Sequence, residues 1–421
     1  MKESEKHISH FDIVVIGGGA SGMMAAGTAA ARGKRVCIVE KNNELGKKLK
    51  ITGGGRCNIT NATYDIHALL SMYGKAHKFL YTPFSLFGVN DTFRFFEERG
   101  LPLVVEAGNR AFPHTHNAHD VFRVLEKYCI DNGVVVMLDA PVERMVMCRT
   151  KARIDAIETS KGSITARAYI FATGGASHPE TGSTGDAFHW LKDMGHTVTP
   201  PSPNIVPLRT AESWVHTLSG VSVDSMKITF LVDGVKKFHK TGKILFTHFG
   251  LSGPLILNSA HTIADMLHEG VVTASVDVVP HLAHGDLDKH IQEIFSEHKN
   301  KNFKNVAEYI APHGMAVSLM MMPGMPLSDT KVHSITKEER KHIVHTLKDM
   351  RCTITGLMGM DKAVVSDGGV PLGDIDLKTM RSRLVDNLYI TGDLLHINRP
   401  SGGYSLQLCW TTGWIAGSCA E

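Results

Sequence analysis

Residues 11–40 constrain the fold most, because they form a complete strand–helix–strand pattern. The apolar run FDIVVI at 11–16 is typical of a buried strand, and the alanine-rich stretch 20–31 predicts a helix. Gly33 lies where a helix C-cap is expected, and VCIVE at 36–40 predicts a second buried strand. This order of elements predicts an α/β fold with a parallel sheet.

The turn after the first predicted strand carries the pattern Gly17-x-Gly19-x-x-Gly22, and Glu40 ends the second strand. In this context the pattern indicates dinucleotide binding: the glycines allow a tight turn, close approach to a pyrophosphate and close helix–strand packing. The helix N-terminus attracts phosphate, and an acidic residue favours an unphosphorylated ribose, as in FAD or NAD rather than NADP. The predicted contacts here are Gly17, Gly19, Ala20, Ser21, Gly22, Glu40 and Lys41.

A second glycine-rich segment, 46–58, reads as a long loop. Three successive glycines at 53–55 stand directly before Arg-Cys-Asn. Such a loop suits a backbone wrapped around an anionic or planar ligand, because glycine permits close approach. The candidate binding residues are Gly46, Lys47, Lys48, Thr52, Gly53, Gly55, Arg56, Cys57 and Asn58.

Four blocks resemble the HI0933-like (BaiN-type) flavoprotein family, and they occur in the family's order over nearly the whole chain. They are GKKLKITGGGRCNITN (46–61), FATGGASHPETGSTGDAF (171–188), ILFTHFGLSGPLIL (244–257) and the stretch from Ala363 to Gly417. The resemblance implies an NAD(P)/FAD-dependent oxidoreductase with a Rossmann-like FAD-binding domain of the glutathione-reductase/fumarate-reductase type.

The resemblance also implies further FAD contacts. Loop 46–58 would line the pyrophosphate and isoalloxazine, and a helix starting near 403–404 would point its N-terminus at the flavin and stabilise negative charge there. The residues implied are Val142, Ala172, Thr173, Gly174, Gly392, Asp393, Gly402, Gly403, Tyr404 and Ser405. The chain departs from the family pattern at three positions: Asp393 replaces Glu, His396 replaces Asp and Ser405 replaces Asn.

The local composition of the sequence changes twice. Four prolines between 200 and 207 mark the start of another domain, and glycine-rich segments recur from about residue 352. We therefore predict one FAD-binding domain, built from 1–195 and 350–421. It is split by an inserted domain at 196–349, β-rich over 196–283 and mainly helical over 284–349.

The net charge and the cysteine content indicate which partners and which compartment to expect. The charge is +3 with no long basic block, so we expect neither nucleic-acid nor membrane binding, and the five glycines that interrupt the uncharged stretch 13–31 argue against a span. Seven cysteines without a C-x-x-C pair favour reduced thiols in a cytoplasmic protein. Oligomeric state is left open.

Several residues carry two interpretations. Cys57 lacks a second cysteine for a dithiol relay, so packing is preferred over a redox role. His114, His116 and His119 are read as loop histidines rather than metal ligands, and no metal is expected. His248 is read as a buried, hydrogen-bonded histidine, with an acid/base role above a flavin as the alternative.

The leading functional hypothesis is NAD(P)H-driven reduction of a small organic substrate, an activated C=C, through flavin N5. No catalytic acid or base is assigned. A flavin oxidase of a small amine or aminoketone that produces hydrogen peroxide is one alternative, and a non-catalytic FAD-binding redox sensor is another. A flavin-dependent RNA-modifying enzyme has little support, since the sequence shows no basic stripe with stacking aromatics.

Overall fold

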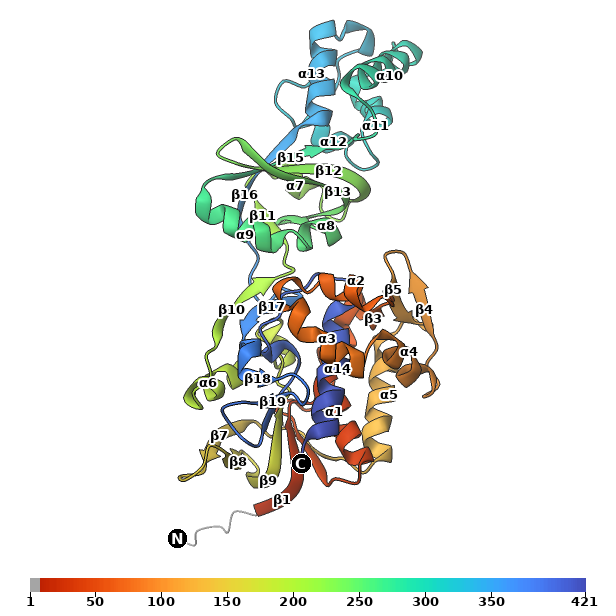
Figure 1. Ribbon diagram of the computed structural model, residues 1–421. Helices are drawn as coiled ribbons and strands as arrows, with labels where there is room; N and C mark the ends of the chain where they lie inside the picture. The colour runs from red at the N-terminus through yellow and green to blue at the C-terminus, as the bar shows by residue number, and fades with distance from the viewer. Residues whose placement is uncertain (1–7) are drawn as a thin grey trace. The chain divides into compact units, whose positions relative to one another are not determined.

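The computed structural model describes residues 8–421, and it divides them into two compact units. Unit 1 combines the N-terminal part of the chain to Pro203 with Val364–Glu421, and unit 2 is the intervening Asn204–Ala363 (Figure 1). The sequence-based boundary after residue 195 therefore falls within unit 1, and the boundary before residue 350 falls within unit 2.

Unit 1 is built on a sheet of order β18-β19-β20-β9-β1-β2-β6, in which the five strands from β20 to β6 run parallel. Apolar runs fill both faces of its central strands, as expected for strands covered by helices on each side. The bounds are β1 (Ile8–Ile16), β2 (Val36–Val39), β6 (Val135–Met137), β9 (Gly162–Phe171), β18 (Ile375–Asp376), β19 (Arg381–Ser382) and β20 (Leu388–Ile390).

Helices α1 (Ala20–Ala31) and α14 (Tyr404–Cys419) lie side by side next to the sheet (Figure 1). Small residues make this possible: a Cβ on Gly413 would lie 2.4 Å from the Ser21 carbonyl oxygen, and one on Gly417 would lie 2.3 Å from that of Ala25. Helix α5 (Ala118–Asp131) packs on α1 in the same way, through Gly27 beneath the Tyr128 ring. These close contacts hold α14 against α1 and α5 against α1.

Smaller elements surround this framework. A sheet of order β3-β5-β4 stands beside α14, and β7 and β8 extend the main sheet from β9. The bounds are β3 (Thr60–Asn61), β4 (Leu103–Glu106), β5 (Arg110–Pro113), β7 (Val142–Met147), β8 (Ile154–Thr159), β10 (Thr199–Asn204), β17 (Val365–Gly369), α2 (Ile66–Ser71), α3 (His77–Leu86), α4 (Val89–Glu97) and α6 (Asp186–Asp193). Short 3-10 turns are η1 (Leu49–Gly55), η2 (Gly74–Ala76), η3 (Pro179–Thr181), η6 (Leu372–Asp374) and η7 (Gly392–Leu394).

Unit 2 is a closed antiparallel barrel of order β11-β14-β13-β12-β15-β16 with its own hydrophobic core. Strand β16 pairs with both β15 and β11, so residues 350–357 complete the barrel and belong with unit 2. The strands are β11 (Leu208–Thr210), β12 (Ser222–Val232), β13 (Val235–Thr247), β14 (Gly250–Ser252), β15 (Val272–Asp277) and β16 (Met350–Leu357).

The helices of unit 2 follow or interrupt these strands. Helices α10 and α13 pack together, and the Arg340 guanidinium pairs with Asp288 at 2.8 Å between them. The helices are α7 (Ser213–Thr217), α8 (Pro254–Leu257), α9 (Ala260–Glu269), α10 (His284–Glu297), α11 (Ala307–Ile310), α12 (Ala316–Met320) and α13 (Lys337–Lys348), with 3-10 turns η4 (Phe303–Asn305) and η5 (Val332–Ser334).

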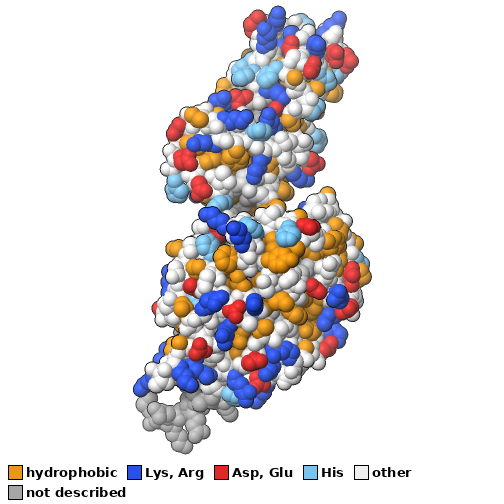
Figure 2. All heavy atoms as spheres, viewed as in Figure 1, with side chains coloured by type: hydrophobic (Ala, Val, Ile, Leu, Met, Phe, Trp, Pro, Cys, Tyr) orange, Lys and Arg blue, Asp and Glu red, His pale blue; other side chains and the backbone are white. Residues whose placement is uncertain are grey.

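Within residues 8–421, no helix is long and apolar enough to cross a membrane. Figure 2 shows Lys/Arg and Asp/Glu side chains interspersed over the viewed face of each unit, without an extended block of either sign.

Candidate functional site

The carboxyl ends of four parallel strands, β1, β2, β9 and β20, meet at one edge of the unit 1 sheet. Each strand leads into a segment singled out by the sequence: Gly17–Gly19, Glu40–Lys41, Ala172–Gly174 and Gly392–Asp393. Parallel α/β sheets bind ligands at this edge.

A cavity with about 1240 Å³ of empty space, including its mouth, opens at this edge. Its lining runs from the glycine turn after β1 to Ser405 in the first turn of α14, so a ligand with several separate groups, such as a dinucleotide, can meet all of these segments. Sixteen of the predicted binding residues line it: Gly17, Gly19, Ala20, Ser21, Glu40, Lys41, Gly46, Lys47, Lys48, Thr52, Val142, Ala172, Thr173, Gly174, Asp393 and Ser405.

The turn from β1 into α1 depends on its glycines. Gly17 has φ +103°, and a Cβ on Gly22 would lie 1.9 Å from the Gly17 carbonyl oxygen. A Cβ on Gly19 would meet nothing within 4 Å, because Gly19 borders the cavity. No side chain caps the first N–H groups of α1, so they and the positive end of the helix dipole stand open to an anionic ligand.

Glu40 lies at the end of β2 with only 8% of its surface exposed, although its carboxylate borders the cavity. Oε2 accepts a hydrogen bond from the Gly18 N–H at 2.7 Å, and Oε1 accepts from the Asn42 N–H at 2.8 Å. A carboxylate fixed in this way can still accept from a ribose hydroxyl.

Lys48 borders the cavity and donates to the Ser177 carbonyl oxygen, with Nζ and O 2.6 Å apart. Burial lowers the pKa of Lys48, although the carboxylate of Asp393 acts in the opposite direction. Beside Glu40, Lys41 Nζ pairs at 2.7 Å with Asp186, the first residue of α6, and so connects the end of β2 with residues 181–186, which line the cavity.

The remaining predicted residues do not line the cavity, and their contact with a cofactor stays a prediction. They are Gly22, Gly53, Gly55, Arg56, Cys57, Asn58, Gly392, Gly402, Gly403 and Tyr404. Gly22 and Gly392 pack within the protein, against Gly17 and Ser21. The Tyr404 ring packs edge-on against Tyr73 with the ring centres 5.9 Å apart.

The N-terminus of α14 resembles that of α1, because a glycine without a side-chain cap precedes each helix. Gly403 precedes the helix with φ +99° and supplies no side-chain cap. A Cβ on Gly403 would lie 2.2 Å from the Thr60 carbonyl carbon, so only glycine fits here. The Asn58 amide, oriented to satisfy its hydrogen bonds, accepts from the Gly403 N–H at 3.0 Å. Loop 46–58 and the start of α14 are thus joined directly.

The side chains of Arg56 and Cys57 lie in different environments. The Arg56 guanidinium lies over the Phe112 ring and pairs with Glu106, and its Nη2 lies 2.7 Å from Nδ1 of His116. Cys57 is fully buried, and burial raises the pKa of its thiol to about 12. A neutral, inaccessible thiol agrees with the packing interpretation.

His248 does not lie where the sequence placed it. It is exposed at the turn between β13 and β14, with its ring 4.9 Å from that of Phe249, so the expectation of a buried histidine was wrong. The expectation failed because strand β13 ends one residue earlier, at Thr247, where the chain turns. Across residues 8–421, no group of three or more His, Cys, Asp or Glu side chains could hold a metal ion.

Sequence reasoning missed several residues at the cavity. They include Asn42, Thr184, Asp186 and Cys409, which line it, and Arg399, which lies behind it. Position 42, two residues after Glu40, and the block 171–188 offered a signal for the first three. Arg399 carried no signal, since its role appears only when the chain brings residues 393 and 405 together.

The residues present fit FAD. Two helix N-termini without a side-chain cap from the preceding glycine, an acidic residue at the end of β2 and a cavity lined by all four strand ends meet the needs of a pyrophosphate, a ribose and a flavin. The fold and site define a dinucleotide-binding flavoprotein.

The family model of the HI0933-like protein Rossmann domain matches residues 11–419, and the chain belongs to this family. It is an FAD-dependent oxidoreductase family, as the resemblance implied. A protein of Clostridium scindens named 3-dehydro-bile acid delta(4,6)-reductase is 30% identical over 97% of this chain and 98% of its own. The ribosomal RNA dihydrouridine synthase of Escherichia coli K12 is 26% identical over 98% of both chains.

Solved structures agree on the fold. A 3-ketosteroid delta1-dehydrogenase from Sterolibacterium denitrificans superposes with a TM-score of 0.53 at 12% identity, over 97% of this chain and 99% of that one. A 3-ketosteroid-delta4-(5alpha)-dehydrogenase from Rhodococcus jostii RHA1 gives 0.50 at 12% identity, over 98% and 97%. At such identities the likeness confirms the Rossmann-like FAD-binding fold.

Proposed function

We propose that this protein is a FAD-dependent reductase that adds hydrogen across a carbon–carbon double bond conjugated with a carbonyl group of a small organic molecule. The proposed electron donor is NADH or NADPH. The observation that carries the proposal is the full-length relative at 30% identity, whose name, 3-dehydro-bile acid delta(4,6)-reductase, denotes reduction of such a conjugated system.

The cavity supports this assignment through the residues that line it. At the α1 end, free N–H groups would hold the pyrophosphate and Glu40 would accept from the adenosine ribose. Asp393 and Ser405 would meet the flavin half, and Lys47, Lys48 and Thr52 also line the cavity and would contact the cofactor. The predicted contacts of residues 53–58 and 402–404 extend this half, since Asn58 joins Gly403.

Bound FAD would supply hydride transfer from N5 to the β-carbon of the conjugated system, with a proton added at the α-carbon. The chain's own contribution is binding, orientation and electrostatics. The uncapped N-terminus of α14 would stabilise negative charge at the flavin, because the helix dipole is positive there.

A second candidate is reduction of a uracil ring in RNA. Two relatives named ribosomal RNA dihydrouridine synthase, from Escherichia coli and Haemophilus influenzae, are each 26% identical over at least 95% of this chain. The C5=C6 bond of uracil is also conjugated with a carbonyl, so both candidates require the same chemistry at the flavin and differ in substrate.

The cytoplasm is the proposed location. All seven cysteines have free thiols, which supports a reducing compartment.

The test is anaerobic stopped-flow spectroscopy of the FAD-loaded protein. We expect NADH or NADPH to bleach the flavin, and a steroid dienone to restore the oxidised spectrum in a second mixing step. Reoxidation by a uridine-containing RNA but not by the dienone favours the second candidate. A third outcome would contradict both candidates: the flavin is bleached by small amines but not by NADH or NADPH, and hydrogen peroxide forms when oxygen is admitted. That outcome would favour the amine-oxidase hypothesis.

A further inference from the structure

Arg399 is a buried cation in the segment that connects η7 to α14. Only 3% of the residue's surface is exposed. Charged side chains are almost never buried this deeply unless they are paired, so the partners of Arg399 indicate what it does.

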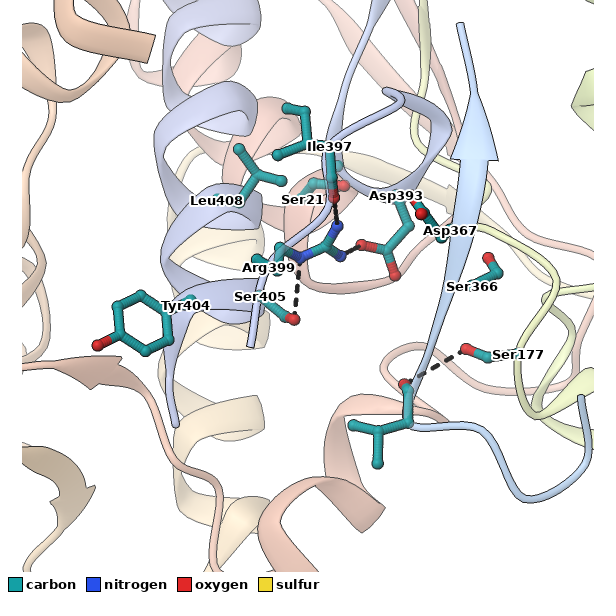
Figure 3. Close-up of polar contacts among 12 residues, drawn as sticks. Ser21, Ser177, Ser366, Asp367, Asp393, Ile397, Arg399, Tyr404, Ser405 and Leu408 are labelled. Atoms are coloured by element: carbon teal, nitrogen blue, oxygen red, sulfur yellow. Dashed lines mark hydrogen bonds and ion pairs between the residues drawn. The ribbon is translucent and has the colours of Figure 1, made fainter. Parts of the chain in front are cut away.

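Each nitrogen of the Arg399 guanidinium has a different partner (Figure 3). Nε donates to the Ser405 hydroxyl at 3.0 Å, Nη1 donates to the Ile397 carbonyl oxygen at 2.6 Å, and Nη2 donates to the Asp393 carboxylate. The planar, rigid guanidinium fixes the directions of these bonds relative to one another. Asp393 and Ser405 are therefore held in one arrangement by a single side chain.

The two side chains that Arg399 holds both border the cavity, whereas Arg399 does not. One partner comes from η7, at the end of β20, and the other from the first turn of α14. Arg399 thus acts on the cavity only through Asp393 and Ser405. It is a positioning residue rather than one that touches a ligand.

We infer that Arg399 is a positioning residue of the FAD site, which fixes the Asp393 carboxylate and the Ser405 hydroxyl toward the flavin half. A second consequence is electrostatic. Arg399 balances the charge of Asp393, so its loss leaves an unpaired carboxylate beside the cavity and disfavours electron uptake by the flavin. The inference rests on FAD binding as proposed above, and not on the identity of the substrate or donor.

The test uses the full chain with Arg399→Gln and Arg399→Lys, and Arg383→Gln as the matched control. Arg383 is exposed and donates from Nε to the Ile375 carbonyl oxygen, away from the cavity. FAD affinity is measured by titrating the apo-protein and following flavin fluorescence, and the midpoint potential of the bound flavin is measured by dye-coupled reduction. Thermal unfolding of the apo-protein gives stability separately.

We expect Arg399→Gln to weaken FAD binding about 10- to 100-fold, the range for loss of hydrogen bonds to charged groups. Its bound flavin should have a lower midpoint potential than the parent, and Arg383→Gln should match the parent. Arg399→Lys keeps the charge but replaces the planar guanidinium with a single nitrogen, which holds Asp393 and Ser405 less rigidly. Its midpoint potential should therefore stay closer to that of the parent than its FAD affinity does.

A double-mutant comparison tests the link between Arg399 and its partner: Ser405→Ala should weaken FAD binding in the parent and have a smaller effect in Arg399→Gln, because the two side chains act together. An unchanged FAD affinity and potential in a folded Arg399→Gln protein would overturn the inference, as would equal effects of Ser405→Ala in the two backgrounds. If Arg399→Gln does not fold, Arg399→Lys carries the same comparison. If the parent protein itself binds no FAD, the proposed function fails rather than this inference alone.

Discussion

The Glu40 carboxylate accepts a hydrogen bond from the backbone N–H of Gly18, with 2.7 Å between Oε2 and N. This bond ties the end of β2 to the glycine turn at the end of β1. The other carboxylate oxygen is held by the backbone and side-chain N–H groups of Asn42. One acidic side chain therefore shapes the turn and also faces the space where a ribose would lie.

Replacing Glu40 should weaken FAD binding and the fold together. Glu40→Ala leaves the Gly18 N–H without its acceptor, which costs about 1–3 kcal/mol, and removes the ribose acceptor. We expect a loss of FAD affinity of about 10- to 100-fold in Glu40→Ala and a smaller loss in Glu40→Gln. Fluorescence titration of the apo-protein measures this, with the exposed Glu143→Gln as control. Unchanged affinity in Glu40→Ala would contradict the assigned ribose contact.

Alanine at two glycines of the same turn should have different effects on stability and on FAD affinity. In Gly22→Ala the new methyl group would lie 1.9 Å from a backbone oxygen, so the apo-protein should lose about 3 kcal/mol or more of its free energy of unfolding. In Gly19→Ala the methyl group enters open space at φ −81°, so stability should be retained. FAD affinity should nevertheless fall, because the methyl group occupies the approach to the pyrophosphate. Urea unfolding and FAD titration of both variants separate these outcomes; a stable Gly22→Ala protein would refute the packing argument.

Gln407 connects α14 to two other elements from inside the core. Its Oε1 accepts from the hydroxyls of Thr60 and Thr92 at 2.5 and 3.0 Å, and its Nε2 donates to Thr411. Gln407→Leu removes three buried hydrogen bonds, although Thr92 and Thr411 keep their bonds to backbone carbonyl oxygens, and it should cost about 2–4 kcal/mol of unfolding free energy. Gln292→Leu, at an exposed glutamine bonded only to Asp288 by the side chain, should cost far less. Equal losses in the two variants would argue against a special role for the network.

Cys57 should behave as a packing residue. Because burial raises the pKa of its thiol to about 12, Cys57 stays neutral and inaccessible at pH 8. We expect Cys57→Ala to retain flavin reduction by the electron donor. In the parent, a thiol reagent should label Cys148 first, since hydrogen bonds from Thr150 lower the pKa of Cys148. Mass spectrometry of labelled peptides reports the order, and early labelling of Cys57 would revive a redox role.

Stability should fall at alkaline pH. Burial raises the pKa values of Cys37, Cys57, Cys129 and Cys409 from 9.0 to about 12 in the folded protein. Above pH 9 the unfolded chain releases these protons while the folded chain keeps them, so unfolding becomes more favourable as pH rises. Urea unfolding between pH 8 and 10.5 should show a decreasing midpoint. A flat profile there would indicate that these thiols are less buried than the structure has them.

The sequence by itself determined the elements whose signals are local. The helix predicted over 20–31 is α1, because the apolar, alanine-rich stretch and the glycines that flank it act within a few residues. The glycine pattern and Glu40 identified the dinucleotide edge of the sheet, since a β-α-β unit brings them together by its own geometry. The four family blocks identified the fold and FAD-dependent chemistry.

Only the tertiary structure decided what depends on distant pairing. Residues 350–357 belong to the barrel because β16 pairs with β11 across about 140 residues of sequence, which no local pattern reveals. Arg399 looks like any loop arginine until folding places it between Asp393 and Ser405. His248 reads as buried from its apolar neighbours, yet a turn exposes it. Burial and charge pairing are properties of packed elements, so they are fixed only when the chain has folded.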